Sequence, residues 1–313
     1  MAYRHYEDLW FEDRNVILEA GGVVFRLYRG ILARNSPIWA DLFAVPQPLA
    51  DAESYDECPI VHLHDDVDDL RYFLHAINDV SFYRSDIATP YPVVAGILRL
   101  ASKYAVSFLR ERCIAHLSLS YPSSLSDWKV RERQQDRAVT DIPAHAIVNL
   151  AREVNALSLL PTALYCYCAA TSLEDIVNGQ MLADGTVATV NDRDRRSCIL
   201  GRVNLGHRQR LQMLGALSTC PDGWPGCSTP SHCQPGQWRM LARLWSLPEE
   251  EGLSCRVLID IGSVKEAKSA TGWCDKCCRY WISRMLDAQT RIWADLPSIF
   301  DLPPWDVLLA SQE

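Results

Sequence analysis

Four cysteines in the C-terminal half of the chain have the spacing of a metal site. Cys227 and Cys233 are separated by five residues, and Cys274 and Cys277 are separated by two. Two residues between ligands let both sulfurs face one ion, and two such pairs complete the tetrahedral thiolate set of structural zinc sites. Gly and Pro residues form turns beside both pairs. The sequence therefore predicts a closed zinc site that stabilises the C-terminal half.

Other roles for these thiols stay open at this stage. Cys220, His232 and Cys278 are nearby competing ligands. Without a metal, the cysteines would be reduced and partly buried, and would pack like small apolar side chains. A reactive redox pair at Cys274 and Cys277 is a third interpretation.

The cellular compartment is inferred from the cysteine content and the first residues. The chain has 12 cysteines, and its first residues contain no apolar run of signal-peptide length. We therefore expect an intracellular protein of the cytoplasm or nucleus, with thiols or metal ligands instead of disulfides. No apolar stretch reaches the roughly 18–20 residues of a membrane span, which argues against a membrane protein.

Three common catalytic patterns are missing from the sequence. There is no phosphate-binding Gly-rich loop, no G-x-S-x-G turn and no H-E-x-x-H helix. His62 and His64 flank Leu63 at the expected end of a strand, where they form a polar strand face or a metal-binding pair. We predict that the chain is not an enzyme. The alternative is a metal-dependent or thiol enzyme in the C-terminal half, which would need an open coordination position.

The charge balance argues against nucleic acid as a partner. The formal net charge is −8 and the isoelectric point is about 5.5, whereas phosphate contacts need a basic face. One basic stretch, interrupted by Asp192 and Asp194, is interpreted as a solvated helix or loop surface, with a nucleic-acid-binding regulator as the alternative. Its basic residues are Arg193, Arg195, Arg196, Arg202, Arg208 and Arg210.

The length of 313 residues and an ordinary globular composition predict two domains of the α+β class. In the first, short helices cover a small sheet. Gly21-Gly22 suits a hairpin turn between two strands, because both positions tolerate positive φ. Ser36 before Pro37 is the N-cap of a helix. Later elements of this domain are a strand at 60–63 and helices near 67–77, 92–103 and 109–121.

A second, mainly helical region is predicted for residues 143–313, after a linker or exposed helix at 122–142. Ser172 and Asp175 have the spacing of a capping box at a helix start. Further helices are expected at 206–217, 237–247 and 278–296.

Residues 25–39 resemble a segment of the BTB/POZ domain. They read FRLYRGILARNSPIW, which is similar to the family's F-x-V-H-R-x-I-L-x-x-R-S-P-V-F, with Tyr28 where the family usually has His. The later strand and helices fit the same pattern, so the resemblance covers residues 8–121. The chain also resembles a group of BTB proteins that is abundant in mushroom-forming fungi. The similarity lies in the cysteine pattern and in the segments Trp10–Asp13, Trp293–Pro297, Ile299-Phe300 and Leu302–Trp305.

The resemblance implies a protein-interaction adaptor. Its implied partners are a second copy of the chain, a cullin-type ubiquitin ligase, or proteins of transcriptional control. Many dimeric members carry an Asp at the position of Asn15, opposite a basic residue; here that residue is Arg29, or Arg29 is a salt-bridged surface residue at a helix start. The predicted interface residues are Leu9, Trp10, Phe11, Arg29, Ile31 and Leu32.

Overall fold

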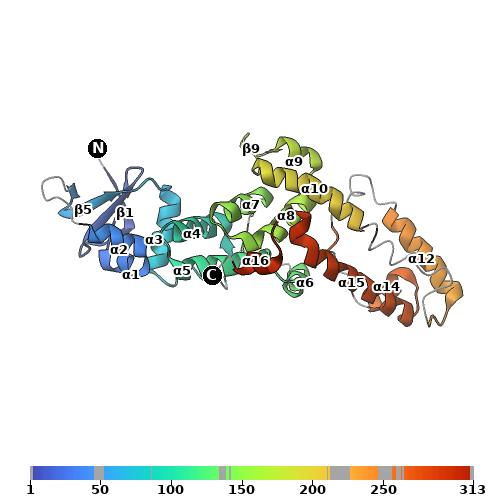
Figure 1. Ribbon diagram of the computed structural model, residues 1–313. Coiled ribbons are helices and arrows are strands. Elements are labelled where there is room, and N and C mark those ends of the chain that lie inside the picture. Colours follow the sequence, from blue (N-terminus) through green and yellow to red (C-terminus); the bar gives the residue numbers. More distant parts are fainter. Residues whose placement is uncertain are drawn as a thin grey trace. The chain divides into compact units, whose positions relative to one another are not determined.

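The computed structural model describes residues 3–45, 53–85, 87–133, 139–140, 142–209, 211, 226–245, 256–258, 262 and 264–310. The chain divides into two compact units (Figure 1). The first comprises Met1–Ser120, Asp136–Ile142 and Arg152–Ala156, and the second comprises Tyr121–Gln135, Pro143–Ala151 and Leu157–Glu313. A small N-terminal sheet is followed by a helical region, which confirms the predicted α+β class.

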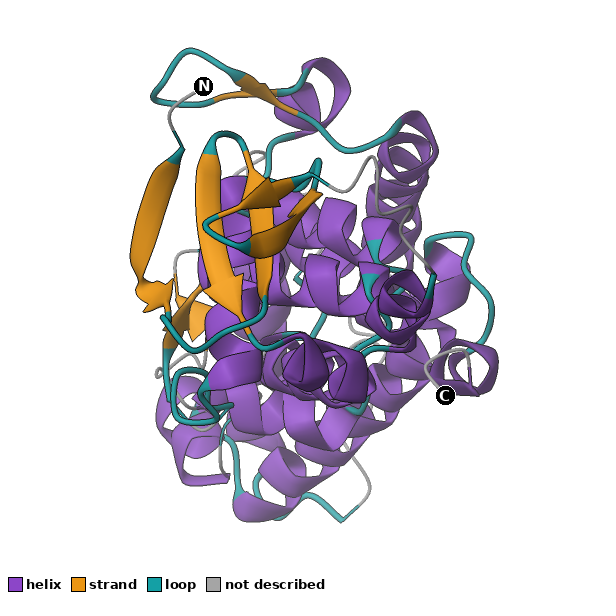
Figure 2. Cartoon of the chain, turned by 90° about the vertical axis from the view of Figure 1, so that its left-hand side faces the viewer, coloured by secondary structure: helices purple, strands orange, loops and turns teal. Residues whose placement is uncertain are grey.

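The sheet of the first unit consists of β1 (Arg4–Trp10), β2 (Val16–Ala20), β3 (Val23–Leu27), β4 (Ser54–Tyr55) and β5 (Cys58–His62). The strands are orange in Figure 2, and their order across the sheet is β1-β3-β2-β5-β4. β2 and β3 are antiparallel, and the turn between them places Gly21 and Gly22 at φ of 53° and 81°. This left-handed backbone favours glycine, so the predicted hairpin is confirmed. β1 lies parallel to β3, and β5 lies parallel to β2.

The helices of the first unit follow the predicted order: α1 (Arg29–Asn35), α2 (Pro37–Ala44), α3 (Val67–Asn78), α4 (Tyr91–Lys103) and α5 (Ser107–Ser120). A short parallel pair, β6 (Thr89–Pro90) and β7 (Val139–Thr140), also belongs to this unit. Ser36 caps α2 as predicted, because its hydroxyl oxygen accepts a hydrogen bond from the Trp39 amide at 3.1 Å. Trp39 is fully buried and stacks on Tyr104 at the end of α4. These contacts fix α2 against α4.

The first strand differs from the sequence prediction, which starts the domain at residue 8. The first residues of β1 are polar or aromatic and mostly exposed, and Leu9 is its one fully buried side chain. The alternation that identifies a half-buried strand is therefore missing. β1 is a strand because its backbone pairs with β3.

The second unit is mainly helical, as predicted. Its elements are α6 (Leu125–Arg133), α7 (Ala144–Glu153, ending in the first unit), the 3₁₀ helix η1 (Leu157–Leu159), α8 (Leu160–Ala170), α9 (Leu173–Asn178), the pair β8 (Gln180–Met181) and β9 (Val187–Ala188), α10 (Asp192–Arg208), α12 (Pro230–Trp245), α14 (Val264–Thr271), α15 (Asp275–Ile299) and α16 (Trp305–Ala310). The predicted start of α9 is confirmed with Ser172 as its N-cap: Ser172 Oγ accepts from the Asp175 amide and donates to the Asp175 carboxylate.

The predicted helix boundaries in this unit need correction. The helix expected at 278–296 is confirmed within α15, whereas α12 begins seven residues before the expected 237. The basic stretch belongs to α10, which begins at Asp192. Most of the helix expected at 206–217 lies outside the described residues. Within the part of the chain that the structure describes, no helix is both long and apolar enough to cross a membrane.

Residues 122–142 do not form a separate linker, because Tyr121–Gln135 belongs to the second unit and Asp136–Ile142 to the first. Trp128 on α6 is almost completely buried, and its indole nitrogen donates to the Leu258 carbonyl at 3.0 Å. Its ring also contacts the rings of Tyr165 and Trp293. α6 is therefore anchored in the core of the second unit.

Candidate metal centre

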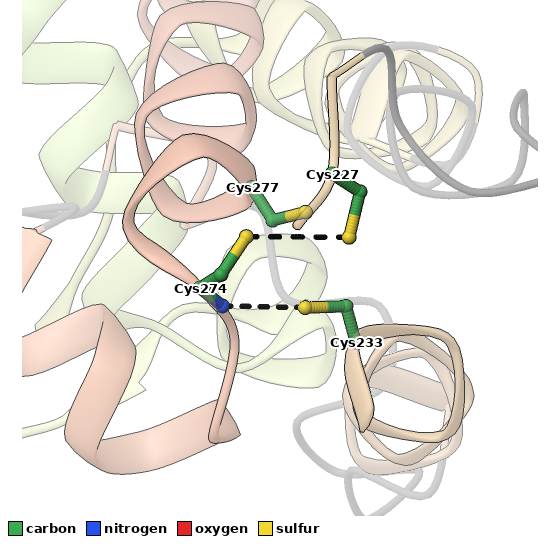
Figure 3. A group of neighbouring side chains, drawn as sticks. All are labelled: Cys227, Cys233, Cys274 and Cys277. Carbon is green, nitrogen blue, oxygen red and sulfur yellow. Dashed lines mark hydrogen bonds between the residues drawn. The ribbon is translucent and has the colours of Figure 1, made fainter. Parts of the chain in front are cut away.

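The structure brings together the four cysteines that the sequence predicts as ligands (Figure 3). Cys227 lies in the loop before α12, and Cys233 lies in the first turn of that helix. Cys274 is the N-cap of α15, and Cys277 lies in its first turn. The four sulfur atoms all lie within 4.8 Å of one another, so they could hold a metal ion.

The dimensions of the cluster fit tetrahedral coordination. Zinc–sulfur bonds of about 2.3 Å place tetrahedral sulfur atoms about 3.8 Å apart. The sulfurs of Cys227 and Cys274 are 4.0 Å apart, which is close to that spacing. Cys233 and Cys277 are buried, and the other two side chains are half-buried. Four protein ligands would therefore close around an ion with only small side-chain movements.

Local backbone geometry positions each pair. Thr229 precedes Pro230 at the start of α12, and its carbonyl accepts from the Cys233 amide at 3.0 Å. At α15, the carbonyl of Cys274 accepts from the Cys278 amide at 3.0 Å. The Cys274 amide donates to the Cys233 sulfur at 3.2 Å, which links the two pairs directly. Helix N-termini favour thiolates, so both pairs are placed where negative charge is stabilised.

The pKa of Cys274 is lowered, whereas the pKa values of Cys227 and Cys277 are raised. Burial opposes the ionisation of Cys274, but hydrogen bonds from the side chain and backbone of Ser228 and from the Cys277 backbone outweigh it and lower the pKa of Cys274 to about 5. Burial, together with hydrogen bonds to the other thiols, raises the pKa of Cys277. Burial is also the main cause that raises the pKa of Cys227. A divalent ion would supply the positive charge that ionises the remaining thiols.

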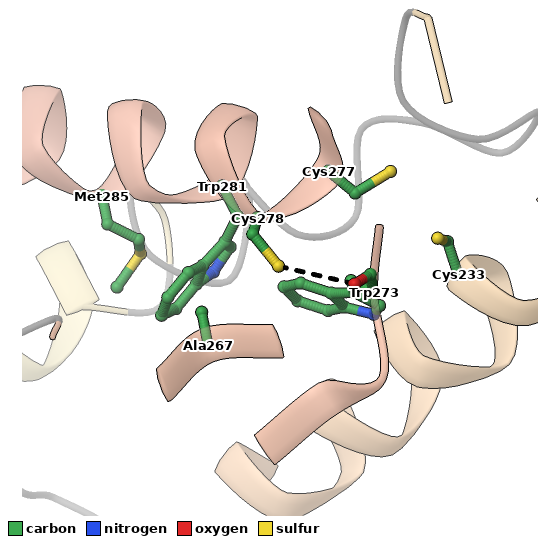
Figure 4. Packing of buried hydrophobic residues seen from close by; sticks show 7 residues of the cluster. All are labelled: Cys233, Ala267, Trp273, Cys277, Cys278, Trp281 and Met285. Carbon is green, nitrogen blue, oxygen red and sulfur yellow. Dashed lines mark hydrogen bonds between the residues drawn. The ribbon is translucent and has the colours of Figure 1, made fainter. Parts of the chain in front are cut away.

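The competing ligands are excluded or lie outside the described residues. Cys278 is buried on the far side of the helix turn, where its sulfur donates to the Trp273 carbonyl (Figure 4). His232 is exposed on α12 and does not belong to the sulfur cluster. Cys220 and Arg210 lie outside the described residues.

An apolar core lies beside the cysteine cluster (Figure 4). Trp273, fully buried, and Trp281 meet edge to face, with ring centroids 5.9 Å apart. Gly236 of α12 approaches so closely that an added Cβ would lie 2.5 Å from the Trp273 indole nitrogen. Its other buried members are Ala267, Trp273, Trp281 and Met285, and Tyr280 and Ile282 pack against it. A metal ion held by the four cysteines would add a cross-link beside these residues.

Two of the predicted interface residues are instead core residues. Leu9 and Leu32 are buried in the first unit, so the prediction that they contact a partner is wrong for their side chains. The other predicted residues reach the surface: Trp10, Phe11 and Ile31 are half-buried, and Arg29 is exposed. Of the predicted surface, these four remain available to a partner.

Asn15 and Arg29 are linked by a hydrogen bond through the Arg29 backbone amide. Asn15 Oδ1 accepts from the Arg29 amide at 2.9 Å, at the start of α1. The Arg29 guanidinium lies over the Phe43 ring, 5.5 Å from its centre. Among the described residues no carboxylate pairs with Arg29, so the predicted surface salt bridge is absent there. Asp13 instead accepts a hydrogen bond from the Tyr28 hydroxyl.

The basic stretch on α10 is largely neutralised by local partners. Arg195 pairs with Asp192, and Arg208 pairs with Asp295 of α15. Arg202 donates to two backbone carbonyls at the end of α8. These three guanidiniums therefore have structural roles, which weakens the case for a nucleic-acid-binding face.

His62 at the end of β5 lies between two carboxylates. Its Nδ1 is 2.7 Å from Glu19, and its Nε2 is 3.1 Å from Glu53. The hydrogen bond with Glu19 is the largest cause that raises the pKa of His62. Burial opposes ionisation of Glu19, but hydrogen bonds from His62 and Gly22 lower its pKa. Within the described residues, His62 and His64 do not join a metal-binding group.

Replacing His62 with Gln should destabilise the first unit in acid and have little effect in base. Protonated His62 contributes its full stabilisation below its unfolded pKa of 6.5, and loses it as the pH rises through the raised folded pKa. The Glu19 contribution is lost as the pH falls below 4.5 through its lowered folded pKa. Because the His62 side chain is 41% exposed, the expected loss near pH 5.5 is below about 1 kcal/mol. Denaturant unfolding of the wild type and the variant near pH 5.5 and pH 9 measures the loss of stability. Equal losses at the two pH values would contradict a pairing of charged His62 with the carboxylates.

Comparison with models of known families, with curated proteins and with solved structures finds no match to this chain.

Proposed function

We propose that the chain is a protein-interaction adaptor whose first unit is a BTB/POZ-type module. The observation that carries the proposal is an apolar surface on α2. Ile38 and Leu42, four residues apart on α2, are 44% and 39% exposed, and Val45, at the C-cap just after the helix, is 59% exposed. Residues four apart share one helix face. An exposed apolar helix face favours a protein-interaction site.

The opposite side of α2 explains why this face is stably presented. Trp39 is fully buried, and Ser36 ties the helix start to the Tyr104 carbonyl at 2.5 Å. Arg29 and Ile31 on α1 reach the surface beside this anchored helix pair. A partner would therefore meet a rigid, preformed surface, which lowers the entropic cost of binding.

The resemblance to BTB/POZ domains supports a second copy of the chain as the first partner to test. It equally supports docking on a cullin-type ubiquitin ligase or a role in transcription, inside the cell. In each case the helical second unit would recognise the client.

We further propose that the four-cysteine cluster holds a structural zinc ion. Four protein ligands leave no coordination position for substrate, and this closed arrangement argues against a metal-dependent enzyme. The ion would cross-link the start of α12 to the start of α15. Its role would be to stabilise this helical region.

The paired substitution I38E/L42E tests the adaptor proposal. We expect the wild-type chain to be dimeric at about 10 μM and the variant to be monomeric, because two carboxylates cannot be buried unpaired in an apolar interface. Light scattering coupled to size-exclusion chromatography measures the mass. Both residues are exposed in the chain, so the fold should be unchanged by circular dichroism.

The control variant is V80E/I87E, which adds the same charge at exposed apolar positions outside α2. It should keep the wild-type mass. If the wild type is monomeric, the partner is a different protein, which the wild type should capture and I38E/L42E should not. A monomeric wild type that captures the same proteins as I38E/L42E would refute the adaptor proposal.

A further inference from the structure

A groove runs along one face of α10 in the second unit. Two adjoining hollows of about 400 Å³ and 370 Å³ share Asn204 on α10 and Ser298 and Ile299 at the end of α15. Arg193 lies at one end and Arg208 at the other, so the groove is about 22 Å long at 1.5 Å per helical residue. That length accommodates a short peptide segment. We call it the α10 groove.

The α10 groove is polar and positively charged at its first end. Arg193 and Arg196 are both exposed, three residues apart and on one helix face. Among the described residues, neither forms an ion pair, unlike Arg195 and Arg208. Asp301 lines the same end, so two guanidiniums face one carboxylate and a positive charge remains. In a chain of net charge −8, this end is complementary to an anionic ligand.

The α10 groove also offers apolar contacts. Leu200 lines the first hollow at 49% exposure, and Leu211 lines the second at 63% exposure. His207 and Asn204 add polar hydrogen-bonding groups between them. A ligand that matches this face needs anionic groups at one end and apolar side chains further along.

A peptide fits this combination better than a nucleic acid does. Nucleic-acid affinity comes from many phosphate contacts, whereas only two guanidiniums of the groove are unpaired among the described residues. Exposed leucines favour aliphatic side chains, which nucleic acids lack. The guanidinium group of Arg can bind both carboxylate and phosphate groups through paired hydrogen bonds.

We propose that the α10 groove binds a peptide segment whose carboxylate or phosphate groups contact Arg193 and Arg196 and whose apolar side chain packs against Leu200. This assigns the second unit its own class of ligand and goes beyond the adaptor proposal for α2. The two proposals are tested by different variants, so either can fail alone.

Fluorescence anisotropy with the full chain tests the proposal. The probes are labelled 12-residue peptides that carry two Glu or two phosphoserine residues three or four positions from a Leu, with Gln and Ser versions as neutral controls. We expect the anionic peptides to bind at least about tenfold more tightly than the neutral ones, and more weakly as salt increases. The tighter of the Glu and phosphoserine sets identifies the anionic group.

The variant R193E/R196E should weaken anionic peptide binding by about tenfold or more, and L200S should weaken it without changing its salt dependence. The control R34E/R291E makes the same change in net charge at two other exposed arginines and should bind like the wild type. Three results would overturn the proposal: equal binding of neutral peptides, equal losses in the control, or tighter binding of a single-stranded oligonucleotide that depends on Arg193 and Arg196.

Discussion

Replacing Cys277 with Ser should abolish metal binding and unfold the region around α12, α14 and the start of α15. The variant would keep only three of the four ligands of the proposed zinc ion. Structural zinc contributes about 10–16 kcal/mol in small zinc-stabilised peptides, which matches or exceeds the whole stability of an ordinary domain. Trp273, Trp281 and Met285 pack beside the cluster, so we expect their packing to loosen when the metal is lost.

Metal analysis of the purified protein measures the loss directly, as a fall from one zinc per chain to almost none. Near-ultraviolet circular dichroism reports the packing of Trp273 and Trp281. His232→Ala is the matched control, because this exposed histidine lies one residue from Cys233 but outside the sulfur cluster. Cys278→Ala should also retain zinc, although it weakens packing. A wild-type chain without zinc, or a C277S chain that retains it, would refute the zinc proposal.

Replacing Trp128 with Ala should destabilise the second unit by about 3–5 kcal/mol, the usual cost of removing a buried large aromatic side chain. Trp128 contacts the rings of Tyr165 and Trp293, and it bonds to the Leu258 carbonyl. The Leu258 amide in turn donates to the Tyr165 hydroxyl at 3.1 Å. The loss would therefore release α6 and the Leu258 segment together. Denaturant unfolding followed by far-ultraviolet circular dichroism measures the change.

Two further variants separate the loss of buried area from the loss of the hydrogen bond and from a general effect of mutating α6. Trp128→Phe keeps most of the buried area and loses the hydrogen bond, so it should cost less than the Ala variant. Val130→Ala, at a half-exposed position two residues away, should change stability by less than about 0.5 kcal/mol. If W128A behaves like V130A, α6 would be an exposed linker helix after all.

The sequence predicts most of the first unit because its signals are local. The Gly21-Gly22 turn and the Ser36-Pro37 helix start each need only neighbouring residues, and both are confirmed. β1 is different, because only Leu9 is buried and the strand depends on pairing with β3. α6 was ambiguous for a similar reason: Trp128 is its one buried residue among charged neighbours.

The cysteine cluster was also predictable, because the spacing within each pair is a local signal. The two-residue spacing favours Cys277, but it leaves the adjacent Cys278 open as a competing ligand, because the choice also depends on which side of the α15 turn faces the loop of Cys227. The α10 groove was not predictable at all. Its walls come from residues about a hundred positions apart, and the hint available was the set of arginines, whose pairing with Asp192 and Asp295 is visible only in three dimensions.

The long interval between the two cysteine pairs affects how the protein is made. Cys233 and Cys274 are 41 residues apart. At a translation rate of about 5–20 residues per second, the ribosome takes about 2–8 s to add the second pair after the first. If the cluster holds zinc as we propose, the nascent chain offers the ion only half of its ligands during that time, and binding by all four thiols must wait until Cys277 has been added.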